Sequence, residues 1–435
     1  MDKIIKDRID AIRQGRIPKG YNRNRYILYP EDWGEPCPLY SVLTESKERN
    51  ENLEYDKDDV LSVSGDYGVV NQIDLLGRSY AGESVAPYHI VYTGDIVYTK
   101  SPLKDNPHGI IKLNKGNSGI VSTLYAVYHC NNDITAQYIE NYFCIDSYLN
   151  NYLKPIVKRG AKNDMKVNNE DVLTGVIPLP PLAEQEKISE ILDHYDRLIK
   201  LCEAKVDEYK SLKKTCLSKM FPQNGSDVPE IRFPGFSGAW EQRKLGEVLS
   251  LLKDGTHGTH PDAENGPYLL SAKNIKDGQI IIDEATDRRI SEEEYSKIHA
   301  TFLLQTGDVL LTIVGSLGES AIFENGGNFT FQRSVAFLRP KEEIISEFLR
   351  TEISTNAFQR ELDERKSQSA QPGIYLGELE KIPICFPLIE EQKRIGRFFL
   401  ELDNLITLHQ REVEEYTKLK KAMTQLLLTG IVRVK

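Results

Sequence analysis

A Glu-x-Lys triplet, Glu364-Arg365-Lys366, is one feature of this chain whose spacing could support catalysis. Many metal-dependent nucleases use such a triplet, because the carboxylate holds a divalent ion close to the reacting phosphate. The triplet lies in the charged stretch RELDERK, and the further carboxylates that a metal-nuclease site needs do not accompany it. Charged helices often contain this spacing by chance, so a solvated helix surface is the favoured interpretation.

Four other residues, Asp254, His257, His260 and Asp262, have types that could bind a metal ion. Their spacing fits a metal site only loosely, and the glycines and proline between them are typical of a turn. An exposed His-Thr loop would suit contacts to phosphates or bases. We therefore expect no metal ion at this loop.

Other signatures of catalysis are missing from the sequence. It contains neither Asn-Pro-Pro-Tyr nor Asp-Pro-Pro-Tyr, which would hold a target adenine, and no Walker A loop for ATP. Gly315-Ser-Leu-Gly318 is an isolated glycine pair, typical of a tight turn. The sequence thus predicts no catalytic residue and no cofactor bound by this chain.

Basic and amide side chains in two loops suit contacts to DNA, where cations bind phosphates and Arg, Lys, Asn or Gln read base edges. The loop KRGAKNDMK concentrates cations around one acid, Asp164. A solvated surface charge is the alternative for each member taken singly. The predicted DNA contacts are Lys100, Lys104, Lys154, Lys158, Arg159, Lys162, Lys166, His257, Lys273, Asn274, Arg333, Arg365, Lys366, Gln368 and Gln371.

Composition limits the class of protein. A net charge of −10 argues against an indiscriminately basic nucleic-acid binder, so any DNA-binding face must be local. No apolar run approaches the length of a membrane span, and the N-terminal stretch is charged and amphipathic, so we expect a cytoplasmic protein. The six cysteines are scattered without a CxxC pair, which favours reduced thiols over a zinc site.

Two long helices must position these loops, one over 181–221 and one over 388–428. The two stretches match at an offset of 207 residues, so that Glu184-Gln185 corresponds to Glu391-Gln392. Apolar residues alternate in steps of three and four, which is the pattern of a heptad seam. The predicted helix-packing residues are Ile188, Leu192, Tyr195, Ile199, Val206, Tyr209, Ile395, Phe399, Leu402, Ile406, Val413 and Tyr416.

A second apolar row flanks each seam, for example at Leu212 and Leu419. Each apolar face is therefore wider than a two-stranded coil would bury, which leaves surface for another protein. At 1.5 Å per residue, each helix would form a rod of roughly 60 Å.

The chain as a whole is predicted to be two copies of one module, a mixed α/β domain followed by a long helix. Between the copies, Gly94-Asp95 corresponds to Gly307-Asp308, and Ile177-Pro178 to Ile382-Pro383. The predicted class is α+β, with two mixed α/β domains separated by two long antiparallel coiled-coil helices in an internal pseudo-twofold repeat. The predicted segments are an N-terminal helix (1–15), the first domain (16–176), the central long helix (177–222), a linker with the second domain (223–381) and the C-terminal long helix (382–435).

Antiparallel helices would hold the two dissimilar α/β domains, which we call heads, facing the same way. Duplex DNA offers equivalent faces about 34–36 Å apart per turn, so such heads could read two half-sites across an unread spacer. Because the heads differ, the site should be asymmetric.

These features together resemble the specificity subunits of type I restriction-modification systems. The resemblance rests on the junctions IPLPPLAEQEKI and IPICFPLIEEQKRI, on GDVLLTIVGSLGE, and on DGTHGTH followed by YLLSAKNI. It implies two target recognition domains, each reading half of a bipartite DNA site, and helices that hold two adenine methyltransferase subunits, with restriction subunits joining through them. The partners, not this chain, would use S-adenosylmethionine, ATP and Mg²⁺. The first domain lacks DGTH-like and KNI elements, so its contacts cannot be transferred from the second.

Two other hypotheses remain open at the level of sequence. The duplicated heads could bind other proteins in an adaptor, with the helices only dimerising. A self-contained nuclease is the third hypothesis. Salt-sensitive, sequence-dependent retention of duplex DNA separates recognition from the adaptor hypothesis, and incubation with Mg²⁺ and DNA without partners tests the nuclease.

Overall fold

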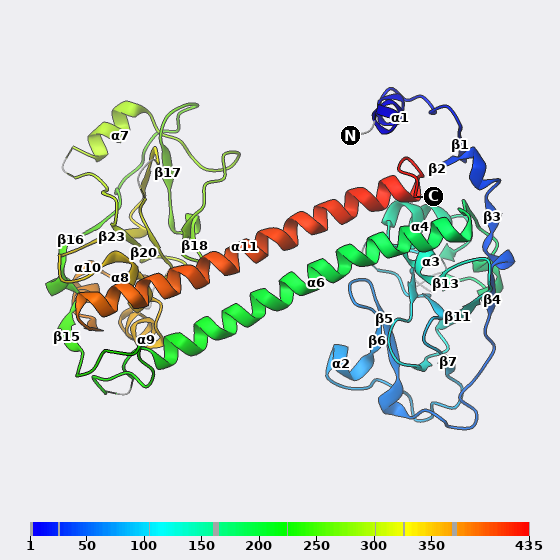
Figure 1. Ribbon diagram of the computed structural model, residues 1–435, viewed down its shortest axis with the longest axis horizontal. Helices are drawn as coiled ribbons and strands as arrows, with labels where there is room; N and C mark the ends of the chain where they lie inside the picture. The colour runs from blue at the N-terminus through cyan, green and yellow to red at the C-terminus, as the bar shows by residue number, and fades with distance from the viewer. Residues whose placement is uncertain are drawn as a thin grey trace. The chain divides into compact units, whose positions relative to one another are not determined.

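Two compact units make up the chain in the computed structural model (Figure 1). Unit 1 comprises Met1–Lys200 and Glu414–Lys435, and unit 2 comprises Leu201–Val413. The division passes through both long helices, α6 (Leu182–Lys219) and α11 (Ile389–Leu428), so each unit contains a part of each helix. The structure describes residues 3–24, 27–103, 105–159, 165–223, 225–300, 302–324, 327–367 and 372–434.

The core of unit 1 lies between a four-stranded antiparallel sheet and two short helices. The strand order is β4 (Leu43–Glu45), β11 (Tyr125–Cys130), β8 (Ile96–Thr99) and β9 (Ile110–Leu113). Helices α3 (Ala136–Phe143) and α4 (Asp146–Leu153) supply buried aromatic rings to the same core. Tyr98 of β8 and Tyr128 of β11 are buried in this core.

Smaller elements complete unit 1. Strands β7 and β10 pair antiparallel beside the main sheet, and β12 pairs with β13 in a hairpin. The remaining elements are α1 (Lys3–Arg13), β1 (Tyr21–Asn24), β2 (Ile27–Pro30), β3 (Cys37–Pro38), β5 (Leu61–Ser64), β6 (Gly68–Asn71), α2 (Gln72–Leu76), β7 (His89–Val91), β10 (Gly119–Val121), β12 (Lys158–Arg159), β13 (Met165–Lys166), α5 (Asn169–Val172) and β14 (Val176–Ile177).

Unit 2 contains a sheet with a corresponding antiparallel order. Its strands are β16 (Leu249–Asp254), β23 (Val335–Pro340), β20 (Val309–Thr312) and β21 (Ser320–Ile322). The flanking strands differ from those of unit 1, because β17 (Tyr268–Leu270) and β22 (Phe329–Phe331) pair in parallel where β7 and β10 are antiparallel. The other elements are β15 (Glu241–Lys244), β18 (Ile275–Lys276), β19 (Gln279–Ile280), α7 (Glu292–Ile298), α8 (Ser346–Ile353), α9 (Asn356–Arg365), α10 (Leu376–Leu379) and β24 (Pro383–Phe386).

Within each unit, the segments of α6 and α11 run in opposite directions. In unit 1, Ile188 and Leu192 share a core with Leu427 and Leu428, and Lys420 Nζ lies 2.5 Å from Asp196 Oδ1. In unit 2, the reciprocal pair Lys213 Nζ and Asp403 Oδ1 lies 2.6 Å apart. The two ion pairs are equivalent at the 207-residue offset of the sequence, and each joins α6 to α11.

A buried glutamine fixes the start of each long helix. Gln185 accepts a hydrogen bond from the Thr135 backbone N–H (3.0 Å) and donates to the carbonyl oxygens of Pro180 and Asp133. Gln392 does the same in unit 2, where it accepts from the Ile345 N–H (3.0 Å) and donates to the carbonyl oxygens of Pro387 and Glu343. The repeated glutamine thus joins each proline-rich junction to its own domain, because buried backbone groups need partners.

The helix-packing residues predicted from the heptads are buried or half-buried. Ile188, Leu192, Val206, Ile395, Phe399, Leu402 and Ile406 are buried, and Tyr195, Ile199, Tyr209, Val413 and Tyr416 are half-buried.

Gly396 allows α11 to approach α8, since a Cβ atom there would lie 2.7 Å from Glu347 Cβ. The equivalent residue of α6 is Ser189, whose hydroxyl accepts a hydrogen bond of 3.5 Å from the Asn141 amide.

All six cysteines are free thiols. Among the described residues, none of the helices combines the length and apolar character required to cross a bilayer.

Candidate nucleic-acid interface

Two residues of unit 2 predicted to contact DNA, His257 and Arg333, line one cavity of about 530 Å³. Both side chains are exposed. Asp254 lines the same cavity, and its carboxylate lies 2.6 Å from His257 Nε2. The cavity therefore offers a guanidinium and an imidazole to a bound group, with an acid that orients the imidazole.

The backbone brings these two side chains together. Thr256 donates its N–H to Phe331 O (2.8 Å), and Arg333 donates its N–H to Thr256 O (3.0 Å). Gly255 makes this approach possible, because a Cβ atom there would lie 2.3 Å from the carbonyl oxygens of Phe331 and Gln332. The glycine of the DGTH run is thus required by the contact with the turn that carries Arg333.

Tyr375 also lines this cavity and was not predicted from the sequence. Its side chain is 76% exposed, which is unusual for so large an aromatic residue. Aromatic rings on a nucleic-acid interface can stack on bases or pack against sugars. No local pattern in GIYLG identifies it; the bridge between Val314 and Gly373 brings its segment to the cavity.

The predicted contacts Gln368 and Gln371 lie outside the described residues. Arg365 and Lys366, at the end of α9, are described. Arg365 Nη2 lies 2.6 Å from Glu361 Oε2, and Lys366 Nζ lies 2.7 Å from Asp363 Oδ1. Such half-exposed pairs are weak enough for a phosphate to compete for the cation.

The four residues with a loose metal-binding spacing do not converge. His257 faces Asp254, whereas His260 Nδ1 lies 2.7 Å from Glu294 Oε1. Asp262 accepts from Arg288 Nε at 2.5 Å. Asp254 and His257 thus pair with each other, whereas His260 and Asp262 have other partners, so the four side chains do not form one cluster.

Lys273 and Asn274 both contact Asp287. Lys273 is exposed, and its Nζ lies 2.7 Å from Asp287 Oδ1. Asn274 is buried; its side chain accepts from the Ser271 N–H and donates to Ile281 O and to Asp287. In this conformation Asn274 has no amide hydrogen to offer a base edge, because the loop uses both. These hydrogen bonds hold the loop, and contact of Asn274 with DNA stays a prediction.

In unit 1, the basic loop begins and ends in the hairpin of β12 and β13. Lys158 pairs in register with Lys166, and Arg159 with Met165. Lys158 and, at the end of α4, Lys154 are exposed. Nothing beyond backbone pairing is described for Arg159 and Lys166, and the predicted contacts Lys104 and Lys162 lie outside the described residues.

Lys100 lies at the end of β8 and is half-buried. Burial lowers the pKa of its ammonium group, and the nearby Glu45 carboxylate acts in the opposite direction. Its ammonium group is therefore less free to move toward a DNA phosphate than the ammonium groups of the exposed Lys154 and Lys158.

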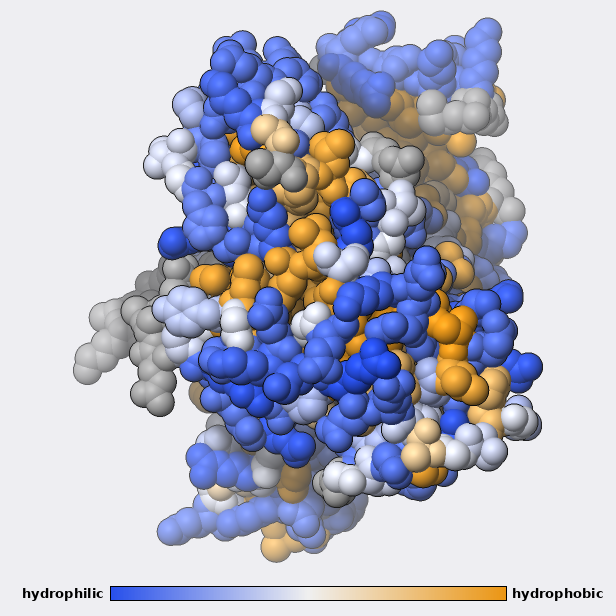
Figure 2. Space-filling model, turned by 90° about the vertical axis from the view of Figure 1, so that its left-hand side faces the viewer, coloured by the Kyte–Doolittle hydropathy of each residue, from blue (hydrophilic) through white to orange (hydrophobic). Residues whose placement is uncertain are grey.

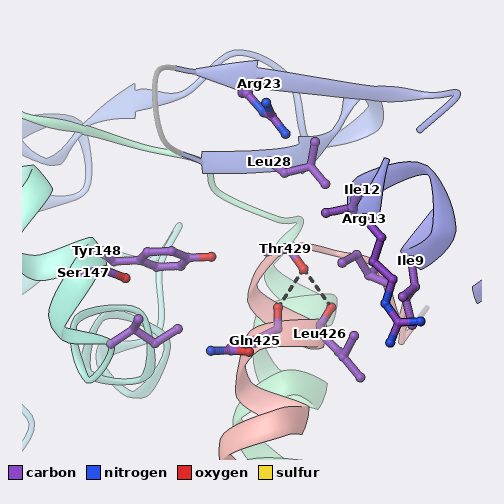
Figure 3. Close-up of a pocket in the computed structure, with 12 residues that line it drawn as sticks. Ile9, Ile12, Arg13, Arg23, Leu28, Ser147, Tyr148, Gln425, Leu426 and Thr429 are labelled. Carbon is purple, nitrogen blue, oxygen red and sulfur yellow. Dashed lines mark hydrogen bonds between the residues drawn. The ribbon is translucent and has the colours of Figure 1, made fainter. Parts of the chain in front are cut away.

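A second cavity of about 530 Å³ lies in unit 1, between α1, the β1–β2 hairpin, α4 and the end of α11 (Figure 3). Ile9, Ile12 and Leu28 give it an apolar lining, and Arg13 and Arg23 are the charged residues of that lining. None of the predicted DNA contacts that the structure describes is among its lining residues.

Four leucines of the long helices are exposed in equivalent pairs. Leu201 and Leu408 are 54% and 51% exposed, and Leu212 and Leu419 are 43% and 48% exposed. Each pair is related by the 207-residue offset of the sequence. Exposed leucines that recur at equivalent helix positions are suited to docking another protein twice.

One face of unit 2 is mainly hydrophilic. Figure 2 looks onto this face, where polar side chains cover most of the surface and apolar ones gather in a band. Exposed apolar residues of this unit include Leu303, Tyr375 and Leu388.

Comparison with known sequences identifies relatives along the chain. A specificity subunit of the type I restriction enzyme MjaVIII from Methanocaldococcus jannaschii is 30% identical over 273 residues, covering 60% of this chain and 62% of that protein. A protein of the same organism assigned to the type I restriction enzyme MjaX is 24% identical, covering 93% and 95% of the two chains. The match therefore spans less than two thirds of the length of the MjaVIII specificity subunit.

Among solved structures, the crystal structure of a type I restriction-modification system S subunit from M. genitalium shares the fold. It has a TM-score of 0.55 and 13% identity, and the match covers 90% of this chain and 95% of the other.

The family model described as the type I restriction modification DNA specificity domain matches the chain twice, at residues 45–210 and 238–417. Each match spans one α/β region and much of the long helix after it. This result confirms the family suggested by the two proline-to-helix junctions. The chain therefore belongs to the family of type I restriction modification DNA specificity domains.

Proposed function

We propose that this chain is the DNA specificity subunit of a type I restriction-modification complex. It recognises an asymmetric, bipartite DNA site, with one half read by each α/β domain. It has no catalytic role of its own, and it works in the cytoplasm. The duplicated match of the family model, one copy on each half of the chain, is the observation that carries this proposal.

The loops and cavities of the two units support DNA recognition. Unit 2 offers His257, Arg333 and Tyr375 around one cavity, and unit 1 offers the exposed Lys158 on a hairpin. The flanking strands of the two units pair differently, so the two heads present different surfaces. Different surfaces are what an asymmetric site requires.

The long helices support assembly with two methyltransferase subunits and, through them, with restriction subunits. We propose that they form an antiparallel coiled coil with a pseudo-twofold axis. The reciprocal ion pairs Asp196–Lys420 and Lys213–Asp403 favour that symmetry, since each is the equivalent of the other. The equivalent exposed leucines would then offer the same docking surface twice. S-adenosylmethionine, ATP and Mg²⁺ belong to the partners.

Genome-wide mapping of methylated adenines tests the proposal. Cells with the chain and its methyltransferase partner should carry methylation at one bipartite sequence, and deletion of the chain should remove it. Methylation that stays at the same sites after deletion would refute the proposal. The adaptor hypothesis predicts a complex with partner proteins but no salt-sensitive, sequence-dependent retention of duplex DNA.

A further inference from the structure

Three potential metal ligands meet where α6 and α11 pack together inside unit 2. They are Cys202 from α6, and His409 and Glu412 from α11. One donor atom from each residue lies within 4.8 Å of the other two. The cluster is separate from the cavity that contains His257 and Arg333, and none of the three residues was predicted to bind a metal.

Helical spacing explains how the donors converge. His409 and Glu412 are three residues apart, so they occupy one face of α11. Cys202 faces them from α6, with its Sγ atom 3.4 Å from Glu412 Oε2, and His409 Nδ1 lies 2.6 Å from the same oxygen. Cys202 and His409 also occupy equivalent positions at the 207-residue offset. The heptad seam therefore points both residues toward the partner helix.

The surroundings hold the ligands in place. Cys202 and His409 are buried, whereas the Glu412 side chain is about one-third exposed. The ring of Tyr209 stacks on the His409 imidazole with a 7° interplanar angle and 5.8 Å between centroids. One side of the cluster is thus packed and oriented, and the side at Glu412 is open to a water molecule.

We propose that Cys202, His409 and Glu412 bind a divalent transition-metal ion, with Zn²⁺ as the ion that fits best, and so clip α6 to α11. A thiolate, an imidazole and a carboxylate are the ligands that zinc takes in proteins, and water completes the tetrahedron in sites with three protein ligands. At zinc bond lengths, tetrahedral geometry separates donor atoms by about 3.3–3.7 Å. The Sγ–Oε2 distance already has that value, and the His409–Glu412 pair must open by less than about 1 Å.

Metal binding requires a change of protonation at the cluster. Burial and the adjacent Glu412 raise the pKa of the Cys202 thiol, whereas hydrogen bonds from His409 and Cys202 lower the pKa of Glu412. Binding therefore has to release the thiol proton to solvent, and the His409 Nδ1 atom binds the ion only when the imidazole has its proton on Nε2. Thiolate and carboxylate together neutralise the two positive charges of the ion, and Lys205 is the cation whose field acts on both of them.

The alternative is a polar cluster without a metal ion, in which Glu412 accepts hydrogen bonds from Cys202 and His409. Cobalt separates the two cases, because Co²⁺ bound to a thiolate gives a charge-transfer absorption band. The full chain, stripped of metal with a chelator, is titrated with Co²⁺ and then with Zn²⁺. We expect one Co²⁺ per chain, a thiolate band that Zn²⁺ abolishes, tighter binding as the pH rises, and a higher Tm of unit 2 with Zn²⁺.

Amino-acid substitutions test which residues bind the metal ion. Cys202→Ser should remove the thiolate band, and Glu412→Gln should weaken Zn²⁺ binding by at least about tenfold, since even second-shell changes cost 10–100-fold. Cys216→Ser is the matched control, because Cys216 is a half-buried thiol of the same helix outside the cluster. It should bind metal as the parent chain does. Glu412 is partly exposed, so its variant remains informative where Cys202→Ser fails to fold.

The absence of a thiolate band in the parent chain, or an unchanged band in Cys202→Ser, would overturn the metal site. Loss of the band in Cys216→Ser would overturn the assignment to Cys202. The metal site goes beyond the proposed function and does not depend on it, since every readout is taken without DNA or partners.

Discussion

Arg433 forms a two-pronged ion pair with Glu184, a residue 249 positions earlier in the chain. The Arg433 Nε and Nη2 atoms lie 2.7 and 2.8 Å from the two carboxylate oxygens, and Trp33 Nε1 donates a third hydrogen bond of 3.0 Å. Burial acts to raise the pKa of Glu184, but the hydrogen bonds from Arg433 and Trp33 outweigh it and lower that pKa. Unit 2 has the corresponding pair, Arg232 with Glu391, at 2.6 and 2.7 Å.

Removal of Arg433 should destabilise unit 1. Arg433→Ala leaves the buried Glu184 carboxylate without its cation, and breaking such a pair costs about 3 kcal/mol of unfolding free energy. The chain has two tryptophans, Trp33 in unit 1 and Trp240 in unit 2. Fluorescence-detected urea unfolding in a Trp240→Phe background therefore reports on unit 1 alone.

The control for this prediction is Lys47→Ala, which also lies in unit 1. Lys47 pairs with Glu170 on the surface, where both side chains are more than two thirds exposed and such an ion pair contributes little to stability. Equal losses for the two variants would contradict a special role for Arg433.

Glu352 should make the stability of unit 2 depend on pH. Burial raises the pKa of this carboxyl group to about 8, although the Cys385 N–H acts weakly in the opposite direction. Between the ordinary value of 4.5 and about 8, the unfolded chain has released a proton that the folded chain retains. The free energy of unfolding should therefore fall as the pH rises through that window.

Glu352→Gln should remove this dependence and stabilise unit 2 at pH 8, by an amount on the order of a few kcal/mol. Urea unfolding at several pH values in a Trp33→Phe background measures it. Glu342→Gln, at an exposed acid in the same unit, is the control and should keep the parent slope. A parent chain whose stability does not fall between pH 5 and 8 would refute the prediction.

The basic loop of unit 1 should contribute to DNA affinity. The double change Lys158→Ala and Arg159→Ala removes two cations, so the salt dependence of binding should weaken by about one unit of slope for each lost phosphate contact. Binding is measured on the methyltransferase complex over a range of salt concentrations. Partner assembly should be unaffected, and unchanged DNA affinity in an intact complex would refute the loop assignment.

Arg333 should contribute to DNA recognition from unit 2. Arg333→Ala should cost about 1–3 kcal/mol of specific binding, the value typical of an arginine that contacts a base edge. Competition between the cognate site and sites altered in one half measures this cost. The effect should be confined to one half-site, and a uniform loss over all sequences would instead assign Arg333 to a phosphate.

The exposed leucines should matter for assembly with the methyltransferase. Leu212→Glu together with Leu419→Glu introduces a charge at two equivalent exposed positions, so it should weaken partner binding without unfolding the chain. Analytical ultracentrifugation of the mixed subunits measures the complex. Since both side chains are more than one-third exposed, circular dichroism should remain that of the parent chain; normal assembly would contradict the docking surface.

The length of the long helices should set the DNA spacer. Insertion of one heptad into both α6 and α11 preserves the seam and adds roughly 10 Å, equal to about 3 base pairs. Methylation mapping should then find the same half-sites separated by a longer spacer. An unchanged spacer would contradict the prediction that the length of the helices sets the DNA spacer.

The sequence by itself determined the elements whose signals are local. Two helices follow from heptads that repeat at a fixed offset. The periodicity of apolar residues shows which face of a helix is apolar, and this information is sufficient to predict which residues pack between the helices. The family could be recognised for the same reason, because the proline-to-helix junctions are continuous in the chain.

Tertiary structure alone decided which distant residues meet. Gly255 lets His257 and Arg333 share a cavity, and packing of α6 on α11 brings Cys202 to His409. Asn274 has a type suited to base contacts, yet the fold buries it against Asp287. Side-chain type and spacing along the chain carry no information on such contacts. The contacts depend on how separate elements pack and on which polar groups this packing removes from water.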